Sequence, residues 1–274
     1  MAQLLRADLL PEAWIAPPAV RQLRALVRHR IQLVRLRTLL RNRIHAVLAD
    51  HGHDRPEGCW SGPGREWLAS LRLPAVSREV IEDDLAVIGA LQRPIDRLDL
   101  EIHERAKADP RVKVLTALPG VGPFTALVIL AEVGDISRFG SARKLAAWAG
   151  LTPTVRGSDR TVRHGHISGQ GSVWVRWILC EAAQTAKRSP QFAATYQAIA
   201  RRRGKKIATT AIARKLLTRA YHLLAGAGDT TAPDAIPRNN AHPARAGRAH
   251  RPGGRQAPGK LAKPHEPATP RSMT

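Results

Sequence analysis

Residues Leu118–Ala126 read LPGVGPFTA and form the sharpest local pattern in the chain. One helix is expected from about Pro110 up to this stretch, and an apolar run that ends near Val133 predicts a second helix after it. Gly120 and Gly122 can adopt the positive φ angles that a tight turn between two helices requires. The stretch therefore predicts two short helices joined by a hairpin, and the rest of the chain is organised around it.

The second of these helices, Pro123–Val133, starts with N–H groups that have no partner inside the helix. These groups and the helix dipole both favour an anion at that end. A GxG turn of this kind is typical of the helix-hairpin-helix, which binds the DNA backbone without reading its sequence. We expect Gly120, Val121 and Gly122 to contact DNA backbone, with the Val121 side chain inserted into the core. The alternative is a tight turn between helices that binds no phosphate.

The charge of the chain also indicates nucleic acid. The 274 residues carry a formal net charge of +22, and residues 137–222 contribute 17 Lys or Arg against two acids. Such an excess usually means a polyanionic partner. No apolar stretch has the length of a membrane span, and no signal peptide is recognised. Cys59 and Cys180 lie in no metal-binding motif and fit a reducing compartment. Together with the basic charge, these observations lead us to expect a cytoplasmic, nucleoid-associated protein without a membrane partner.

Composition predicts a mainly α fold. Hydrophobic residues make up 43% of the chain and aromatic residues only 4%, so the core must consist of Leu, Ala, Val and Ile, which favours helices. Residues 1–52 are expected to form an arginine-rich helical arm that ends near Asp50. Its basic face could bind phosphates or be solvated. Residues 53–75 are expected to form a loop-rich linker. His51 and His53, at the start of this linker, have no third residue at a spacing that suits a metal site.

Residues 76–109 are expected to form one long, coiled-coil-like helix. Its apolar positions recur in alternating steps of three and four, and Pro94 is expected to kink it or break it in two. We expect this helix to pair copies of the chain into a homo-oligomer, with its acids on a solvated face. The expected seam is Val80, Asp84, Val87, Leu91, Ile95, Leu98 and Ile102, and the acids considered and rejected as a metal site are Asp83, Asp84, Asp96 and Asp99.

Residues 110–225 are expected to form a helical domain, and residues 226–274 a disordered basic tail that is rich in proline and has too little apolar surface to bury. Inside the domain, the stretch 154–172 is crowded with hydroxyl groups, glycines and arginines. A site for phosphate chemistry needs such a small nucleophile, a mobile backbone and cationic donors.

Three blocks of this domain resemble the bacterial insertion-sequence transposases of the IS110/IS1111 group, over about residues 112–224. A weaker resemblance extends over residues 4–52. The blocks are the hairpin at Leu118–Gly122 with Glu132–Ile136 and Phe139, the segment LAAWAGLTP at Leu145–Pro153, and the segment GHIS at Gly165–Ser168 with Gly171, Ser172 and Arg176.

The resemblance implies a catalytic serine. In that group, a serine five residues after the proline of a Gly-Leu-x-Pro motif attacks the DNA backbone, and this position corresponds to Ser158. The group often has glycine after this serine, whereas this chain has Asp159. The implied mechanism passes through a covalent phosphoserine intermediate, which preserves the bond energy of the cut strand for joining to a second strand. Neighbouring residues could assist, namely Arg156, Arg160 and Arg163 as phosphate stabilisers and His164 or His166 as proton carriers, while Ser168 and Ser172 are rival nucleophiles at expected helix-capping positions.

The resemblance further implies double-stranded DNA and a guide noncoding RNA as partners. Members of the group carry an acidic ribonuclease-H-like domain that holds Mg²⁺, and Met1–Arg6 resembles the segment that follows its acids. We therefore expect no metal or cofactor in this chain, Mg²⁺ only with that domain, and impaired recombination without it. Two alternatives are a non-catalytic DNA- or RNA-binding remnant and a helix-hairpin-helix glycosylase. The second is disfavoured because Asp135 lies too near the hairpin to be its catalytic acid.

Overall fold

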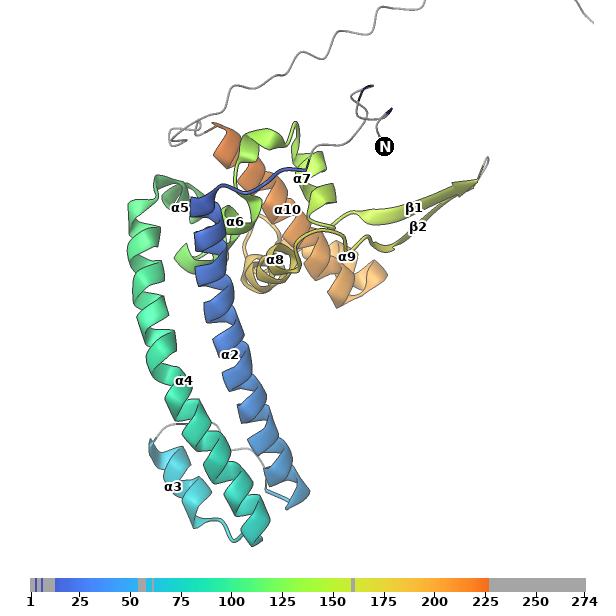
Figure 1. The fold of residues 1–274 in the computed structure, drawn as a ribbon. Helices are drawn as coiled ribbons and strands as arrows, with labels where there is room; N and C mark the ends of the chain where they lie inside the picture. The colour runs from blue at the N-terminus through green and yellow to red at the C-terminus, as the bar shows by residue number, and fades with distance from the viewer. Residues whose placement is uncertain are drawn as a thin grey trace, which may run out of the picture. The chain divides into compact units, whose positions relative to one another are not determined.

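The computed structural model describes residues 13–53, 58–60, 62–158 and 161–226, with the isolated positions 3 and 6. These residues are mainly helical, which confirms the predicted fold class (Figure 1). Arg160 and the predicted disordered tail, apart from its first residue, lie outside the described residues. The helices are α2 (Pro18–Asp50), α3 (Gly62–Ser70), α4 (Ala75–Ala108), α5 (Pro110–Leu115), α6 (Pro123–Val133), α7 (Ala142–Trp148), α8 (Val173–Ala186), α9 (Ala193–Arg203) and α10 (Lys205–Gly226), with a 3₁₀ turn η1 (Ile136–Arg138).

The two long helices α2 and α4 lie side by side and antiparallel, and α3 covers the end where they are joined (Figure 1). Helix α2 ends at Asp50, as the sequence predicts. Helix α3 was not predicted, because residues 53–75 were expected to be a loop-rich linker. It forms because Leu68 is buried against the far end of the helical pair and Trp67 packs beside it.

The α4 seam is occupied by α2 of the same chain. The buried isoleucines recur every seven residues at Ile81, Ile88, Ile95 and Ile102. The predicted seam is correct at Asp84 and from Leu91 onward. It is one residue off at Val80 and Val87, which stand next to the buried isoleucines Ile81 and Ile88. Helix α4 also continues through Pro94. The seam on which the homo-oligomer prediction rested is therefore filled within the chain.

Two α4 acids make ion pairs with α2, contrary to the prediction of a solvated acidic face. Asp84 is fully buried and pairs with Arg43, and Asp99 accepts from Arg30 at 2.8 Å. A buried carboxylate must be paired in this way, since desolvation otherwise disfavours its charge. These two acids set how α2 and α4 face each other.

The main core lies around α6, α8 and α10. Helix α10 packs on α5, α7, α8 and α9, and α6 is buried along nearly its whole length. The core side chains are mostly Leu, Ala, Val and Ile, as composition predicts. None of the described helices combines the length and apolarity that a membrane crossing requires.

Candidate functional site

The stretch with the predicted nucleophile forms two antiparallel strands, β1 (Pro153–Ser158) and β2 (Thr161–Ile167), which the sequence analysis did not predict. This ribbon extends away from the helices (Figure 1). Its apolar side chains are exposed, with 59% of Val155 and 66% of Val162 open to solvent. An isolated two-stranded ribbon is at best marginally stable in water, so its stability must come from where it joins the helices.

The strand register brings predicted site residues together. Arg156 pairs with Arg163, and Ser158, the last residue of β1, pairs with Thr161. Because residues alternate between faces along a strand, these four residues share one face of the ribbon. Like charges directly opposite each other repel, and within the described part of the chain neither arginine has an ion-pair partner. Two cationic residues therefore stand opposite each other on this face.

Both predicted histidines belong to β2. The backbone of His164 pairs with Val155, on the face opposite to Ser158. His166 is exposed, and its carbonyl oxygen accepts a hydrogen bond from the Thr154 hydroxyl at 3.2 Å. The His166 side chain is therefore open to solvent.

We name the segments that join the ribbon to the helices, residues 149–152 and 168–172, the ribbon anchor. Arg176 of α8 holds both segments, because its Nη1 donates to the carbonyl oxygens of Ala149 (3.2 Å), Gln170 (2.7 Å) and Gly171 (3.2 Å). The amide of Ser168 also donates to the Thr152 carbonyl at 2.8 Å. The anchor thus fixes the start of β1 to the end of β2.

Two glycines allow this close approach. Gly150 has φ 70° and Gly171 has φ 77°, a region that other residues rarely adopt. A Cβ atom added at Gly150 would overlap the carbonyl oxygen of Gln170, and one at Gly171 would overlap that of Trp148. Both glycines are required by packing as well as by backbone conformation.

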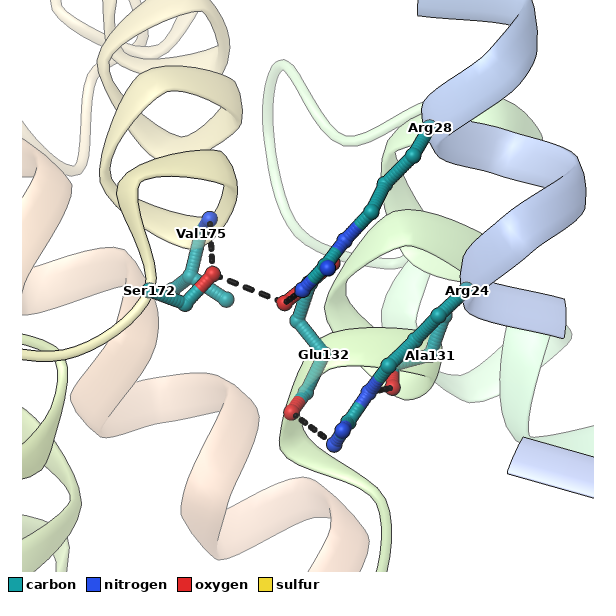
Figure 2. Close-up of polar contacts among 6 residues, drawn as sticks. All are labelled: Arg24, Arg28, Ala131, Glu132, Ser172 and Val175. Carbon is teal, nitrogen blue, oxygen red and sulfur yellow. Dashed lines mark hydrogen bonds and ion pairs between the residues drawn. The ribbon is translucent and has the colours of Figure 1, made fainter. Parts of the chain in front are cut away.

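A buried carboxylate connects the anchor to α2 and α6 (Figure 2). Glu132 of α6 is 2% exposed and accepts from Arg28 Nε at 2.6 Å and Nη2 at 2.7 Å. The Ser172 hydroxyl donates to the same carboxylate at 2.8 Å. Arg24 donates to the carbonyl oxygens of Ala131 and Glu132, at 2.6 and 2.9 Å. The hydrogen bond to Glu132 is the main cause that raises the pKa of Arg28.

Of the two rival serines, Ser172 belongs to this network and Ser168 does not. Ser172 accepts from the Val175 amide at 3.3 Å and is the N-cap of α8, as predicted. Its hydroxyl donates to the buried Glu132 carboxylate (Figure 2), so Ser172 is part of the network between α6 and α8. Ser168 is not a cap, and its amide bonds to Thr152 instead. Glu132 itself was missed as a network residue, although an acid inside an apolar helix signals a buried ion pair.

The hairpin glycines have different surroundings. Gly120 has φ 78° and lies against α8, where an added Cβ would overlap the Ala182 carbonyl oxygen. Gly122 is the N-cap of α6 and has open space around it. Val121 is buried, which confirms its insertion into the core. An open hollow beside the hairpin is lined by Thr116–Gly122, Thr185 and Ser189–Gln191, so Gly122 is the hairpin residue with most room for a phosphate.

A cationic stack lies next to this core. The Arg138 guanidinium lies 4.1 Å from the centre of the Trp14 ring and 4.8 Å from that of Trp148. Burial among these rings, followed by the charge of Arg24, lowers the pKa of Arg138 to about 10. Arg138 is still charged at neutral pH, and it holds the segment around Trp14 on the helical core.

The described residues do not fit a magnesium site. They contain no group of three His, Cys, Asp or Glu side chains that could hold a metal ion. The two buried carboxylates, Asp84 and Glu132, are already paired with Arg43 and Arg28. Mg²⁺ therefore stays a prediction for a separate acidic domain.

Comparison with known proteins finds a match over residues 112–197, to the family model described as "Transposase IS116/IS110/IS902 family". The chain is 28% identical over 198 residues to a "Probable family 20 transposase" of Pseudomonas aeruginosa, covering 69% of this chain and 59% of that protein. It is 29% identical over 192 residues to a "Putative transposase y4qE" of Sinorhizobium fredii, covering 70% and 47%.

A third relative is the "Transposase for insertion sequence element IS1111A" of Coxiella burnetii. It is 29% identical over 210 residues, which cover 70% of this chain and 55% of that protein. The chain thus spans about half the length of the relatives that it matches. The matched family region contains the hairpin, the ribbon and the ribbon anchor.

Proposed function

Because the chain belongs to the IS116/IS110/IS902 transposase family, we propose that it acts in DNA transposition, with the ribbon presenting Ser158 to the DNA backbone. The observation that carries the proposal is the register of the ribbon. Arg156 and Arg163 pair across the strands on the face of Ser158, with no acid among the described residues to neutralise them. A DNA phosphate supplies the missing negative charge.

The proposed reaction conserves bond energy. Ser158 Oγ attacks a phosphorus atom of the DNA backbone, the bond from phosphorus to a deoxyribose oxygen breaks, and a phosphoserine ester forms. The proton of the serine passes to His166 or to water, and the leaving deoxyribose oxygen takes up a proton. A hydroxyl group of a second strand then attacks the ester, which releases the serine and joins the strands. The two arginines stabilise the extra negative charge on the phosphate during both attacks.

A covalent adduct tests this proposal. The chain is incubated with end-labelled duplex DNA, denatured in detergent and separated on a gel, beside Ser158→Ala and the control Thr161→Ala, which alters the paired residue on the same face. We expect label to migrate with the wild-type protein and with Thr161→Ala, and to be lost in Ser158→Ala. An adduct that persists in Ser158→Ala would contradict the serine mechanism.

A second candidate function is non-catalytic binding of nucleic acid, and the open surroundings of Gly122 favour it. It predicts duplex binding that is indifferent to Ser158→Ala and no adduct from any variant. Binding would weaken in Gly122→Ala, which the turn accommodates because its φ of −88° is open to any residue. The adduct gel and a binding titration of these two variants separate the two functions.

The proposal extends to the partners that the family resemblance implies. A guide RNA would add a second polyanion to a chain of net charge +22. Self-association would have to use a surface other than the α4 seam, because α2 fills that seam. Light scattering of the chain with and without DNA measures its oligomeric state directly.

A further inference from the structure

A groove outside the proposed catalytic face lies between α2 and the start of α8. We name it the α2–α8 groove. It has a volume of about 400 Å³, and its lining is formed by Arg30, Ile31, Val34, Arg35, Thr38, Leu39 and Asn42 of α2 with Trp177 of α8.

An arginine stacked on two tryptophans forms one wall of the groove. The Arg35 guanidinium lies 4.7 Å from the ring centre of Trp174 and 5.2 Å from that of Trp177. No described residue forms an ion pair with Arg35. The stack is thus a flat surface with a positive charge that the protein does not neutralise.

The rest of the lining combines apolar and polar groups. Leu39 is 58% exposed, and the exposed Thr38 and Asn42 stand beside it. Arg30 borders the groove and keeps its pair with Asp99. No acid lines the groove. A purely apolar partner would leave Arg35 and Asn42 desolvated without hydrogen bonds, which is unfavourable.

These groups match the chemistry of an unpaired base. Single strands bind where bases stack on aromatic rings and arginine planes within a positively charged groove, and an amide can hydrogen-bond to base edges. The bases of an intact duplex are stacked on each other and do not offer these faces. Trp174 and Trp177 stand two and five residues after Ser172, in the first turns of α8, so the groove lies close in sequence to the end of the ribbon anchor.

We propose that the α2–α8 groove binds an unpaired base of a DNA strand, stacked on Trp177 and Arg35, next to the strands that the ribbon acts on. The proposal rests on the proposed function for its DNA partner, because strand exchange must unpair bases near the reacting phosphate. It adds a site for single strands that is separate from the face of Ser158.

The test is a binding titration with a fluorescent DNA 12-mer of mixed sequence, as a single strand, as a duplex and as the RNA of the same sequence. The variants are Trp177→Ala, the conservative Trp177→Phe and Arg35→Gln, with Arg21→Gln as a control that removes an exposed α2 charge outside the groove. We expect Trp177→Ala to weaken single-stranded DNA binding about tenfold, Trp177→Phe to restore most of it, and Arg35→Gln to weaken it more than Arg21→Gln does. Duplex binding should change less than twofold in the two Trp177 variants.

A photocrosslink identifies the site without a substitution. The same single strand with 5-bromodeoxyuridine is irradiated with the wild-type chain, and the crosslinked peptide is sequenced. A crosslink at Trp174 or Trp177 supports the proposal, and crosslinks confined to other peptides overturn it. Equal binding of single-stranded DNA by Trp177→Ala, or tighter binding of the RNA strand than of the DNA strand at this site, also overturns it. The Ser158 adduct would be unaffected by these results, so the two proposals fail separately.

Discussion

The ribbon and its anchor are adjacent in sequence but differ in what holds them. The ribbon is exposed, carries an opposed arginine pair and has no acidic partner among the described residues. The anchor is held by Arg176, by two glycines in close contact with backbone and by the buried Glu132 network. We infer that the anchor supplies stability and the ribbon supplies chemistry, so substitutions in the two regions should have different effects.

The largest expected effect is on folding, at the anchor glycines. Gly171→Ala should lower the free energy of unfolding by about 4 kcal/mol, because it combines an unfavourable positive φ with overlap on the Trp148 carbonyl. Gly169→Ala is the matched control, since Gly169 has φ 66° but nothing within 4 Å of an added Cβ. It should lose only about 1 kcal/mol. Urea unfolding followed by circular dichroism measures both, and equal losses would show that the close approach does not matter.

The next effect concerns the buried ion pair. Arg28→Met leaves the 2%-exposed Glu132 carboxylate without its bidentate partner and should cost about 3 kcal/mol of stability. Glu132→Gln should cost about 1 kcal/mol, because Arg28 is 39% exposed and can turn to water. The same urea titration compares the two. If Glu132→Gln is the more damaging variant, Glu132 acts through something other than charge pairing.

A smaller effect is expected at Arg176. Arg176→Ala removes the donor that the carbonyl oxygens of Ala149, Gln170 and Gly171 share, and should cost about 2 kcal/mol. Loosening of the anchor should also speed amide hydrogen exchange in the anchor itself, which mass spectrometry of peptides that cover residues 149–152 and 168–172 would detect. Unchanged exchange together with lost stability would mean that Arg176 supports only α8.

The smallest effect on folding is expected in the ribbon itself. Arg156→Ala and Arg163→Ala should change stability by less than ~0.5 kcal/mol, because both side chains are exposed and repel each other. Each should weaken DNA binding about fivefold and reduce the slope of log affinity against log salt by about 1. Arg93→Ala, an exposed α4 position, is the control and should leave the slope unchanged. Equal salt slopes in all three variants would show that the two ribbon arginines do not contact DNA phosphates.

Sequence reasoning predicted the helical elements well where one periodicity dominates. Apolar spacing and glycines at turns and helix ends predict three features correctly. These are the hairpin around Val121, the end of α2 and the seam after Leu91. The first half of the seam is ambiguous, because Val80 and Ile81 both fit the heptad and only packing against α2 selects the isoleucine. Local patterns therefore identified elements but could not always select the buried face.

The ribbon and its anchor were harder to predict because their causes are not local. The strands carry Gly157 and Gly165 and have no buried apolar face, so they lack the alternation by which strands are recognised. The partners of Glu132 lie about 40 and 104 residues away, at Ser172 and Arg28. Stacks such as Arg35 on Trp177 likewise join residues far apart in the chain. These contacts exist only once the helices have packed.

The separation of the ribbon from its anchor is tested most directly by amide hydrogen exchange of the full chain with and without duplex DNA. We predict that amides of residues 155–158 and 161–163 exchange rapidly in the free protein and are protected by DNA. The anchor amides of Ser168 and Gly169, which bond to Thr152 and Gly150, should be protected in both states. Rapid exchange at the anchor, or DNA protection that leaves the ribbon unchanged, would contradict the account.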